Sequence, residues 1–138
     1  NFWPGEERVT THREVVASPD APAAAGAYSQ AIKANGFVFV SGQLGLVPGT
    51  KQFAGGTVAE QTEQALKNIS AILQAAGTSL RHVVKVTVLL ADISYFSEMN
   101  TAYSAFFPEE PPARAAFGAS GLPLGGLVEI EAIAVLPG

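Results

Sequence analysis

Arg114 stands in a short apolar stretch whose composition predicts a strand. All other residues of the segment 112–117 are proline, alanine or phenylalanine. A guanidinium in such surroundings needs a partner if it is buried, and its planar fork matches a carboxylate in a bidentate manner. Arg114 is therefore a candidate for binding a carboxylate ligand. The structural alternatives are an exposed arginine at the start of a strand and an ion pair with a carboxylate of the protein itself.

Two glutamates, Glu129 and Glu131, are separated by one residue in the last apolar stretch of the chain. Side chains alternate between the two faces of a strand, so both carboxylates share one face. Such a pair could exchange protons with a substrate or position a water molecule. Glu129 comes first and is expected near the loops that precede the strand, where a cleft could form. The alternatives are a solvated face and a pairing with Arg114 or Lys85.

Two short polar segments, YSQ at 28–30 and SGQ at 41–43, follow or contain a glycine. Backbone N–H groups beside a glycine can approach an anion closely, although turn formation explains both segments as well. The motifs of nucleotide binding, zinc proteases and serine hydrolases are missing. The two histidines are far apart, and the chain has no cysteine. We therefore expect no metal site, no thiolate chemistry and no disulfide.

The composition describes one well-packed and weakly charged domain. The chain has 138 residues, of which 48% are hydrophobic and 14% charged, against about 25% charged residues in an average domain. These values exclude intrinsic disorder, and the net charge of −4 argues against nucleic-acid binding through phosphate neutralisation. Because so few charges leave apolar surface uncovered, and such surface marks interfaces, we expect a homo-oligomer.

The first third of the chain predicts strands and turns. Residues 1–8 show no periodicity and are expected to form a loose arm, and a short strand is expected at 13–17. A proline- and alanine-rich loop follows at 19–27. The turn signal Asn35-Gly36 predicts a hairpin between strands at 28–34 and 37–41.

Two helices are expected in the middle of the chain. Apolar residues recur at helical spacing from Val58 to Ala76. Both ends of this helix carry matching signals, Thr57 and Glu60 for a capping box and Gly77 just beyond the C-terminus. A second helix is expected to start after Asp92 or Ser94 and to stop at Pro108.

The remaining strands are expected at 83–90, 113–117 and 127–136. With antiparallel pairs at both ends of the chain, the pattern favours an α+β domain in which two helices pack on one face of a mixed β-sheet. No third helix is available for the other face, which again indicates contacts between copies of the chain. We assign residues 1–18 to an N-terminal arm and first strand, and residues 19–138 to a single domain.

Several motifs, in order, resemble the RidA/YjgF family. The segment PAAAGAYSQA at 22–31 is similar to the family's PAAxGPYSQA, and SGQ at 41–43 and PAR at 112–114 match two further signatures. The pattern N-x-x-Y-x-x-F-F at 100–107 and the pair LP…EIEA at 122–132 complete the series. The resemblance runs from about residue 22 to residue 136, more than four fifths of the chain.

The resemblance implies a chorismate-mutase-like fold and a homotrimer whose sheets face inward and whose clefts lie between subunits. It implies hydrolytic deamination of reactive enamines and imines (2-aminoacrylate, its tautomer 2-iminopropanoate, and 2-iminobutanoate) to 2-oxo acids and ammonia. It also implies that neither a metal nor an organic cofactor takes part. The expected partners are then a small-molecule substrate and other copies of the chain, without nucleic acid or membrane.

The family's site residues carry over position by position. Arg114 would clamp the substrate carboxylate, and Glu129 would position and activate the attacking water. Tyr28 would line the cleft and orient the substrate. The remaining lining residues would be Ser41, Gly42, Asn100 and Ala116. Because an imine carbon is already electrophilic, orientation and proton management are sufficient for its hydrolysis.

Three alanines depart from the family pattern. Ala27 stands where the family often has proline, and Ala115 and Ala116 follow the arginine where polar residues are common. If the family's residue at 116 contacts the ligand, this chain lacks that contact. The alternative function is therefore a trimeric module that binds 2-oxo acids or amino acids and regulates a metabolic enzyme without turnover. An endoribonuclease, an activity attributed to some relatives, is disfavoured by the acidic charge.

The chain shows no signal-peptide pattern, and no apolar run reaches the roughly 18 residues of a membrane-spanning helix. We therefore expect a protein of the cytosol, or of the mitochondrial matrix or plastid stroma after removal of a transit peptide, and not a secreted one.

Overall fold

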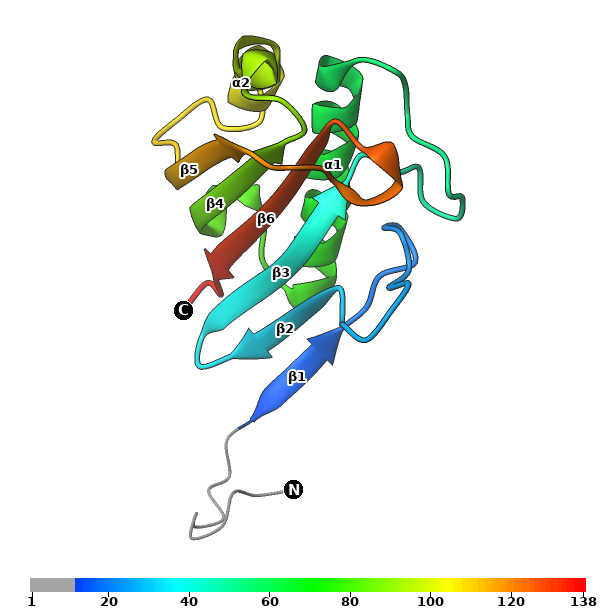
Figure 1. Cartoon of the computed structure of the whole chain (residues 1–138). Coiled ribbons are helices and arrows are strands. Elements are labelled where there is room, and N and C mark those ends of the chain that lie inside the picture. Colours follow the sequence, from blue (N-terminus) through cyan, green and yellow to red (C-terminus); the bar gives the residue numbers. More distant parts are fainter. Residues whose placement is uncertain (1–11) are drawn as a thin grey trace, which may run out of the picture.

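Six strands form a mixed sheet, and two helices pack against one of its faces (Figure 1). The computed structural model describes residues 12–138, and the arm expected at residues 1–8 lies outside the described part. The spatial order of the strands is β1-β2-β3-β6-β4-β5. In chain order the elements are β1 (Arg13–Val16), β2 (Ala31–Ala34), β3 (Phe37–Leu44), α1 (Val58–Ala76), β4 (Val83–Leu90), α2 (Phe96–Ser104), β5 (Ala113–Gly118) and β6 (Val128–Val135). The expected α+β class, with its mixed sheet and two helices on one face, is confirmed.

Helix α1 has the bounds that its sequence predicts. Thr57 and Glu60 form both hydrogen bonds of a capping box at its start. Gly77 ends the helix in the left-handed conformation, with φ 91°, which a residue without a Cβ adopts at little cost. Fully buried residues such as Leu66 and Ile69 face the sheet.

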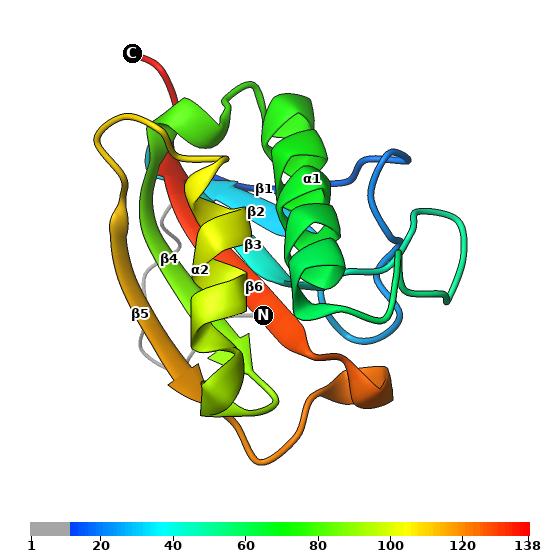
Figure 2. The same ribbon diagram turned by 90° about the horizontal axis from the view of Figure 1, so that it is seen from above.

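Helix α2 begins later and ends earlier than the sequence indicated. The Asp92 carboxylate accepts a hydrogen bond from the backbone N–H of Ser94, at 2.8 Å, and caps a 3-10 turn from which α2 continues at Phe96. The helix ends at Ser104, one turn before Pro108. Figure 2 shows α2 beside α1 on the same face of the sheet.

The expected hairpin is present between β2 and β3, with Asn35 and Gly36 both at positive φ in its turn. Strand β2 is shorter than predicted, because residues 28–30 belong to a loop. Strand β3 is longer than predicted and continues to Leu44 through an irregularity between Val40 and Gln43. This extension carries the SGQ segment into the sheet.

The two C-terminal strands do not pair with each other, contrary to the expectation of an antiparallel pair at that end. Strand β6 lies between β3 and β4 and is antiparallel to both, whereas β5 runs parallel to β4 at the edge. A parallel connection needs a crossover, which α2 supplies. The alanine-rich β5 brings little apolar area, while Val128, Ile130 and Ala134 of β6 are fully buried in the centre.

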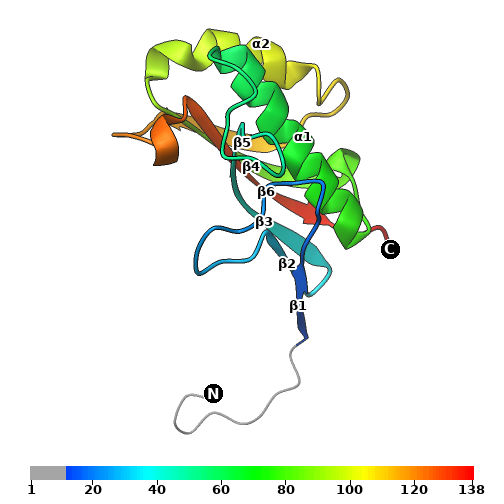
Figure 3. The ribbon, with the colours of Figure 1, turned by 90° about the vertical axis from the view of Figure 1, so that its right-hand side faces the viewer.

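The two faces of the sheet differ in their cover. Both helices lie on one side (Figure 3). On the other side Phe37, Phe39 and Phe117 are 37%, 44% and 48% exposed. This open apolar face agrees with the expectation of contacts between copies of the chain. No helix within residues 12–138 is long and apolar enough to cross a membrane.

Candidate active site

An open cleft of about 660 Å³ lies where β3 ends and β6 begins. Three segments that are far apart in the sequence line it: the loop 22–28, the last residues of β3, and the start of β6 with the preceding turn. Four of the expected site residues meet here, namely Tyr28, Ser41, Gly42 and Glu129. The cleft is therefore built from loops and strand ends that other parts of the molecule must hold in place.

Gln30 holds the loop that forms one wall. Its side chain accepts a hydrogen bond from the N–H of Ser18 at 2.6 Å and donates to the carbonyls of Ser18 at 3.1 Å and Pro22 at 2.7 Å. Gln30 is only 4% exposed, so its side-chain amide cannot bond to water. The hydrogen bonds to the main chain take the place of those to water. In the sequence Gln30 is only one letter of the YSQ motif, and that motif does not reveal its structural role.

Tyr28 stands half-exposed at the mouth of the cleft. Its hydroxyl accepts a hydrogen bond from the N–H of Ala25 at 3.2 Å, and its own N–H donates to the carbonyl of Gly26 at 2.9 Å. The ring is thereby folded back on its own loop, which fixes its position without help from a ligand.

Ser41 joins β3 to the same loop. Its hydroxyl donates to the carbonyl of Ser29 at 2.6 Å, and its N–H donates to the carbonyl of Gln30 at 2.9 Å. The hydroxyl proton is thus engaged within the protein, and the hydroxyl oxygen can only accept from a ligand.

Gly42 makes room for Glu129. A Cβ atom at position 42 would lie 2.9 Å from Oε2 of Glu129, closer than atoms tolerate without movement. The half-buried carboxylate of Glu129 has a raised pKa, because burial disfavours its charge and the like charge of Glu131 adds to the effect. A carboxylate whose pKa moves toward neutrality is better suited to general-base work.

Two polar residues on the buried face of α1 fix the floor of the cleft. Asn68 donates from Nδ2 to the carbonyls of Leu44 at 3.2 Å and Leu46 at 2.9 Å. Gln61 accepts from the N–H of Leu127 at 2.9 Å, just before β6. Both were missed from the sequence, although polar residues seven positions apart on an apolar helix face are a signal that could have found them.

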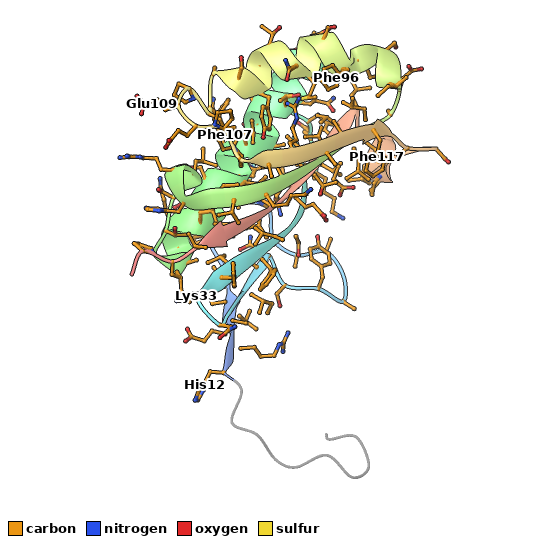
Figure 4. All side chains as sticks on the ribbon, turned by 90° about the vertical axis from the view of Figure 1, so that its left-hand side faces the viewer. His12, Lys33, Phe96, Phe107, Glu109 and Phe117 are labelled. Carbon is orange, nitrogen blue, oxygen red and sulfur yellow. The ribbon has the colours of Figure 1, made fainter. Side chains whose placement is uncertain are left out.

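The other expected site residues form a second group, between α2 and β5. Arg114 donates from Nη1 to Oδ1 of Asn100 at 2.7 Å. Its guanidinium carbon lies 5.3 Å from the ring centre of Phe96 and 4.8 Å from that of Tyr103. Figure 4 shows Phe96 on α2, above the edge of the sheet that β5 forms. Ala116 is half-buried on the same strand.

Within residues 12–138 Arg114 forms no ion pair with a carboxylate, and the recorded pair is Lys33–Glu14 at 3.5 Å. The described residues therefore do not show Arg114 in a structural ion pair, which was one of the alternatives. Its remaining N–H donors stay available to a planar anion.

Arg114 and Glu129 lie on opposite faces of the sheet in one chain. Arg114 is in register with Val86, a buried residue under the helices. Glu129 is in register with Leu89, whose partner on β5 is Phe117 on the open face. Positions 114 and 117 differ by an odd number, so their side chains point to opposite faces. A single chain thus brings the expected site residues together in two groups rather than one.

Comparisons with known proteins agree with the sequence motifs. A family model described as Endoribonuclease L-PSP matches residues 18–136. Reactive Intermediate Deaminase A, chloroplastic, of Arabidopsis thaliana is 50% identical over 124 residues, which are 90% of this chain and 66% of the plant protein. The 2-iminobutanoate/2-iminopropanoate deaminase of Bos taurus is 51% identical over 123 residues, covering 89% of this chain and 90% of that protein.

A solved structure shares the fold as well. The crystal structure of RidA from the Antarctic bacterium Psychrobacter superposes with a TM-score of 0.85 at 46% identity, covering 89% of this chain and 99% of that one. A family match over most of the length, together with relatives that are half identical, establishes that the chain belongs to the endoribonuclease L-PSP family, the RidA/YjgF family that its motifs resemble.

Proposed function

We propose that this chain is a deaminase of reactive 2-imino acids, which hydrolyses 2-iminopropanoate and 2-iminobutanoate, with their enamine tautomers, to 2-oxo acids and ammonia. The observation that carries the proposal is the pair of groups described above. One presents a carboxylate of raised pKa in an open cleft, and the other presents an arginine that forms no ion pair with a carboxylate of residues 12–138. The names of the half-identical relatives support the same activity.

The reaction needs few protein groups. Arg114 binds the substrate carboxylate and thereby places the imine carbon. Glu129 accepts a proton from water while the water oxygen bonds to that carbon and the C=N electron pair moves to nitrogen, which takes up a proton. The aminoalcohol then collapses: Glu129 gives its proton to the amino nitrogen and takes up the hydroxyl proton as the C–N bond breaks, so that ammonia leaves and the carbonyl of the 2-oxo acid forms. The proton left on Glu129 returns to water and balances the one that the nitrogen took up. No step requires a metal or an organic cofactor.

The site of this proposal lies between copies of the chain. Because Arg114 and Glu129 face opposite sides of one sheet, a small substrate can touch both only when they come from different copies. The exposed phenylalanines of the open face give such copies an apolar surface to bury. The proposal therefore includes the homotrimer expected from the family resemblance, with inter-subunit sites lined by Tyr28, Ser41 and Gly42 of one copy and Asn100 and Ala116 of another.

The alternatives receive less support from the site. A regulatory module without turnover would use Arg114 in the same way but has no need of a half-buried carboxylate with a raised pKa. An endoribonuclease would have to bind phosphates in a cleft lined by Glu129 and Glu131, where negative charges repel them. For the compartment, the chloroplastic name of the plant relative supports an organelle among those expected from the sequence.

A coupled assay tests the proposal. An amino-acid oxidase generates 2-iminopropanoate or 2-iminobutanoate in solution, and the loss of the imine is followed with and without the protein. We expect acceleration over spontaneous hydrolysis with the native chain and none with Arg114→Ala. An unaccelerated loss for several imine side chains would contradict the deaminase and favour the binding module.

A further inference from the structure

One face of α2 carries three side chains that all meet Arg114. Phe96, Asn100 and Tyr103 occupy positions i, i+4 and i+7 of the helix, which place them on the same side. Asn100 accepts the single hydrogen bond recorded for the guanidinium, at 2.7 Å, while both rings lie under its charge, at 5.3 and 4.8 Å. The contact between α2 and β5 is therefore centred on this arginine.

Other neighbours offer the guanidinium little. The next residue on the same face of β5 is Ala116, and the residues on either side of Arg114 are alanines. In the described part of the chain no carboxylate pairs with it. A single hydrogen bond would leave the long side chain of Arg114 free to turn about that bond. The direction of the guanidinium therefore depends on the rings of the α2 face as well.

Tyr103 presents its ring to Arg114, with the guanidinium carbon 4.8 Å from the ring centre. The residue is 4% exposed, and its hydroxyl has no hydrogen-bond partner among the described residues. Burial raises the pKa of Tyr103, and Arg114 opposes part of that rise through its positive charge and through the approach of its guanidinium to the hydroxyl oxygen. An orphaned buried hydroxyl adds no stability, so the residue contributes through its ring, which packs against the ring of Phe107 at 4.8 Å between centres and also turns a face to the cation.

We propose that Phe96 and Tyr103 are positioning residues for the carboxylate-binding arginine. Asn100 anchors one nitrogen of the guanidinium, the two ring faces stop it from turning about that hydrogen bond, and the donors that remain are aimed at the carboxylate of the ligand. The substrate named here rests on the proposed function, but the inference itself concerns the binding of any small 2-oxo or 2-imino carboxylate at Arg114.

The test compares loss of a ring with loss of the hydroxyl. Tyr103→Leu and Phe96→Leu remove a ring, Tyr103→Phe keeps it, and Phe106→Leu removes a partly buried ring of the same segment that has no recorded stacking on Arg114. The Kd of 2-oxobutanoate is measured by calorimetry, KM and kcat are measured in the imine assay, and the unfolding temperature is recorded for each protein.

We expect the Kd and KM to rise about tenfold in Tyr103→Leu, equivalent to about 1.4 kcal/mol, and by a smaller factor in Phe96→Leu, with kcat changed much less. Tyr103→Phe should restore the native Kd, since it retains the aromatic face. Phe106→Leu should lower the unfolding temperature while leaving Kd and KM unchanged.

Three outcomes would overturn the inference. The first is an equal loss of affinity in Phe106→Leu and Tyr103→Leu, which would indicate general packing. The second is a loss in Tyr103→Phe as large as in Tyr103→Leu, which would assign the role to the hydroxyl. The third is no binding of 2-oxobutanoate by the native chain. Failure of the proposed function is a separate result, namely a native protein that binds the 2-oxo acid through Arg114 but does not accelerate imine loss.

Discussion

The cleft between β3 and β6 and the group between α2 and β5 position their polar side chains by different means. In the cleft, buried amides bind main-chain groups: Gln30 ties the loop at Ser18 and Pro22, and Asn68 ties the segment after β3. Between α2 and β5, side chains contact side chains, and Arg114 is held by an amide oxygen and two rings.

The two regions should therefore respond differently to substitutions. In the cleft, buried side chains hold the main chain of the loops. A substitution of such a side chain displaces a whole loop and lowers stability and activity together. Between α2 and β5, side chains of one helix face position the guanidinium of Arg114. A substitution there changes the direction of the guanidinium and affects ligand affinity first. The two groups also lie on opposite faces of the sheet, so neither can complete the proposed site within its own chain.

The largest effect is expected when the two groups are inactivated in separate chains. Arg114→Ala and Glu129→Gln should each lower kcat/KM by about 10²-fold or more, the first through lost carboxylate binding and the second through a lost base. If the site combines one residue from each of two copies, co-expression of both variants restores intact sites. Random assembly of equal amounts gives about a quarter of the native number of sites.

Recovered activity is measured on the co-purified mixture, with its oligomeric state checked by light scattering. A mixture as inactive as its components, at an unchanged oligomeric state, would show that both side chains must come from one chain, and the proposed inter-subunit site would be wrong.

A second effect, on stability, should distinguish the cleft wall from its surroundings. Gln30→Ala removes hydrogen bonds to buried main-chain groups and leaves the N–H of Ser18 without its partner. We expect a loss of about 2 kcal/mol in the free energy of unfolding, measured by chemical denaturation, with a parallel fall in kcat/KM. Gln74→Ala is the control, because that glutamine is exposed on α1. Equal losses in both would deny Gln30 a special role.

A third and smaller effect concerns the space beside Glu129. Gly42→Ala places a Cβ 2.9 Å from the Glu129 carboxylate and should displace it, with kcat falling about tenfold. Gly56→Ala meets no atom within 4 Å and is the matched control. In a Glu129→Gln background the extra effect of Gly42→Ala should shrink, since the group that it displaces has already lost its function. Full additivity would contradict this coupling.

The sequence predicted elements better than it predicted neighbours. The periodicity and caps of α1 and the run of β4 are local signals, and they gave the observed bounds. The pairing of β6 with β3 and β4 depends on which strand best fills the centre, which no local pattern states. In the same way, motif letters named Arg114 and Glu129, but only the strand register shows that they face opposite sides. Gln30 and Asn68 look like ordinary polar residues until their distant backbone partners are known.

The smallest expected effect is a displacement of the pH profile. The pKa of Glu129 is raised above 4.5 first by burial and second by the charge of Glu131. A base must be ionised, so activity should fall as pH drops through this raised pKa. Glu131→Gln removes only the second cause and should move the acid limb of kcat/KM slightly to lower pH, toward the ordinary value. Glu63→Gln removes an equal charge from the exposed side of α1 and should leave the limb in place.

The same shift predicts the sign of a stability change. A carboxyl whose pKa is higher in the folded state stabilises the fold below its unfolded pKa, and this contribution is lost as pH rises through the folded pKa. Glu131→Gln lessens that loss, because one like charge fewer opposes ionisation of Glu129. The variant should therefore gain a little stability relative to the native chain at neutral pH and none at low pH, where Glu129 is protonated in both. A gain that is equal at both pH values would assign the effect to something other than the two carboxylates.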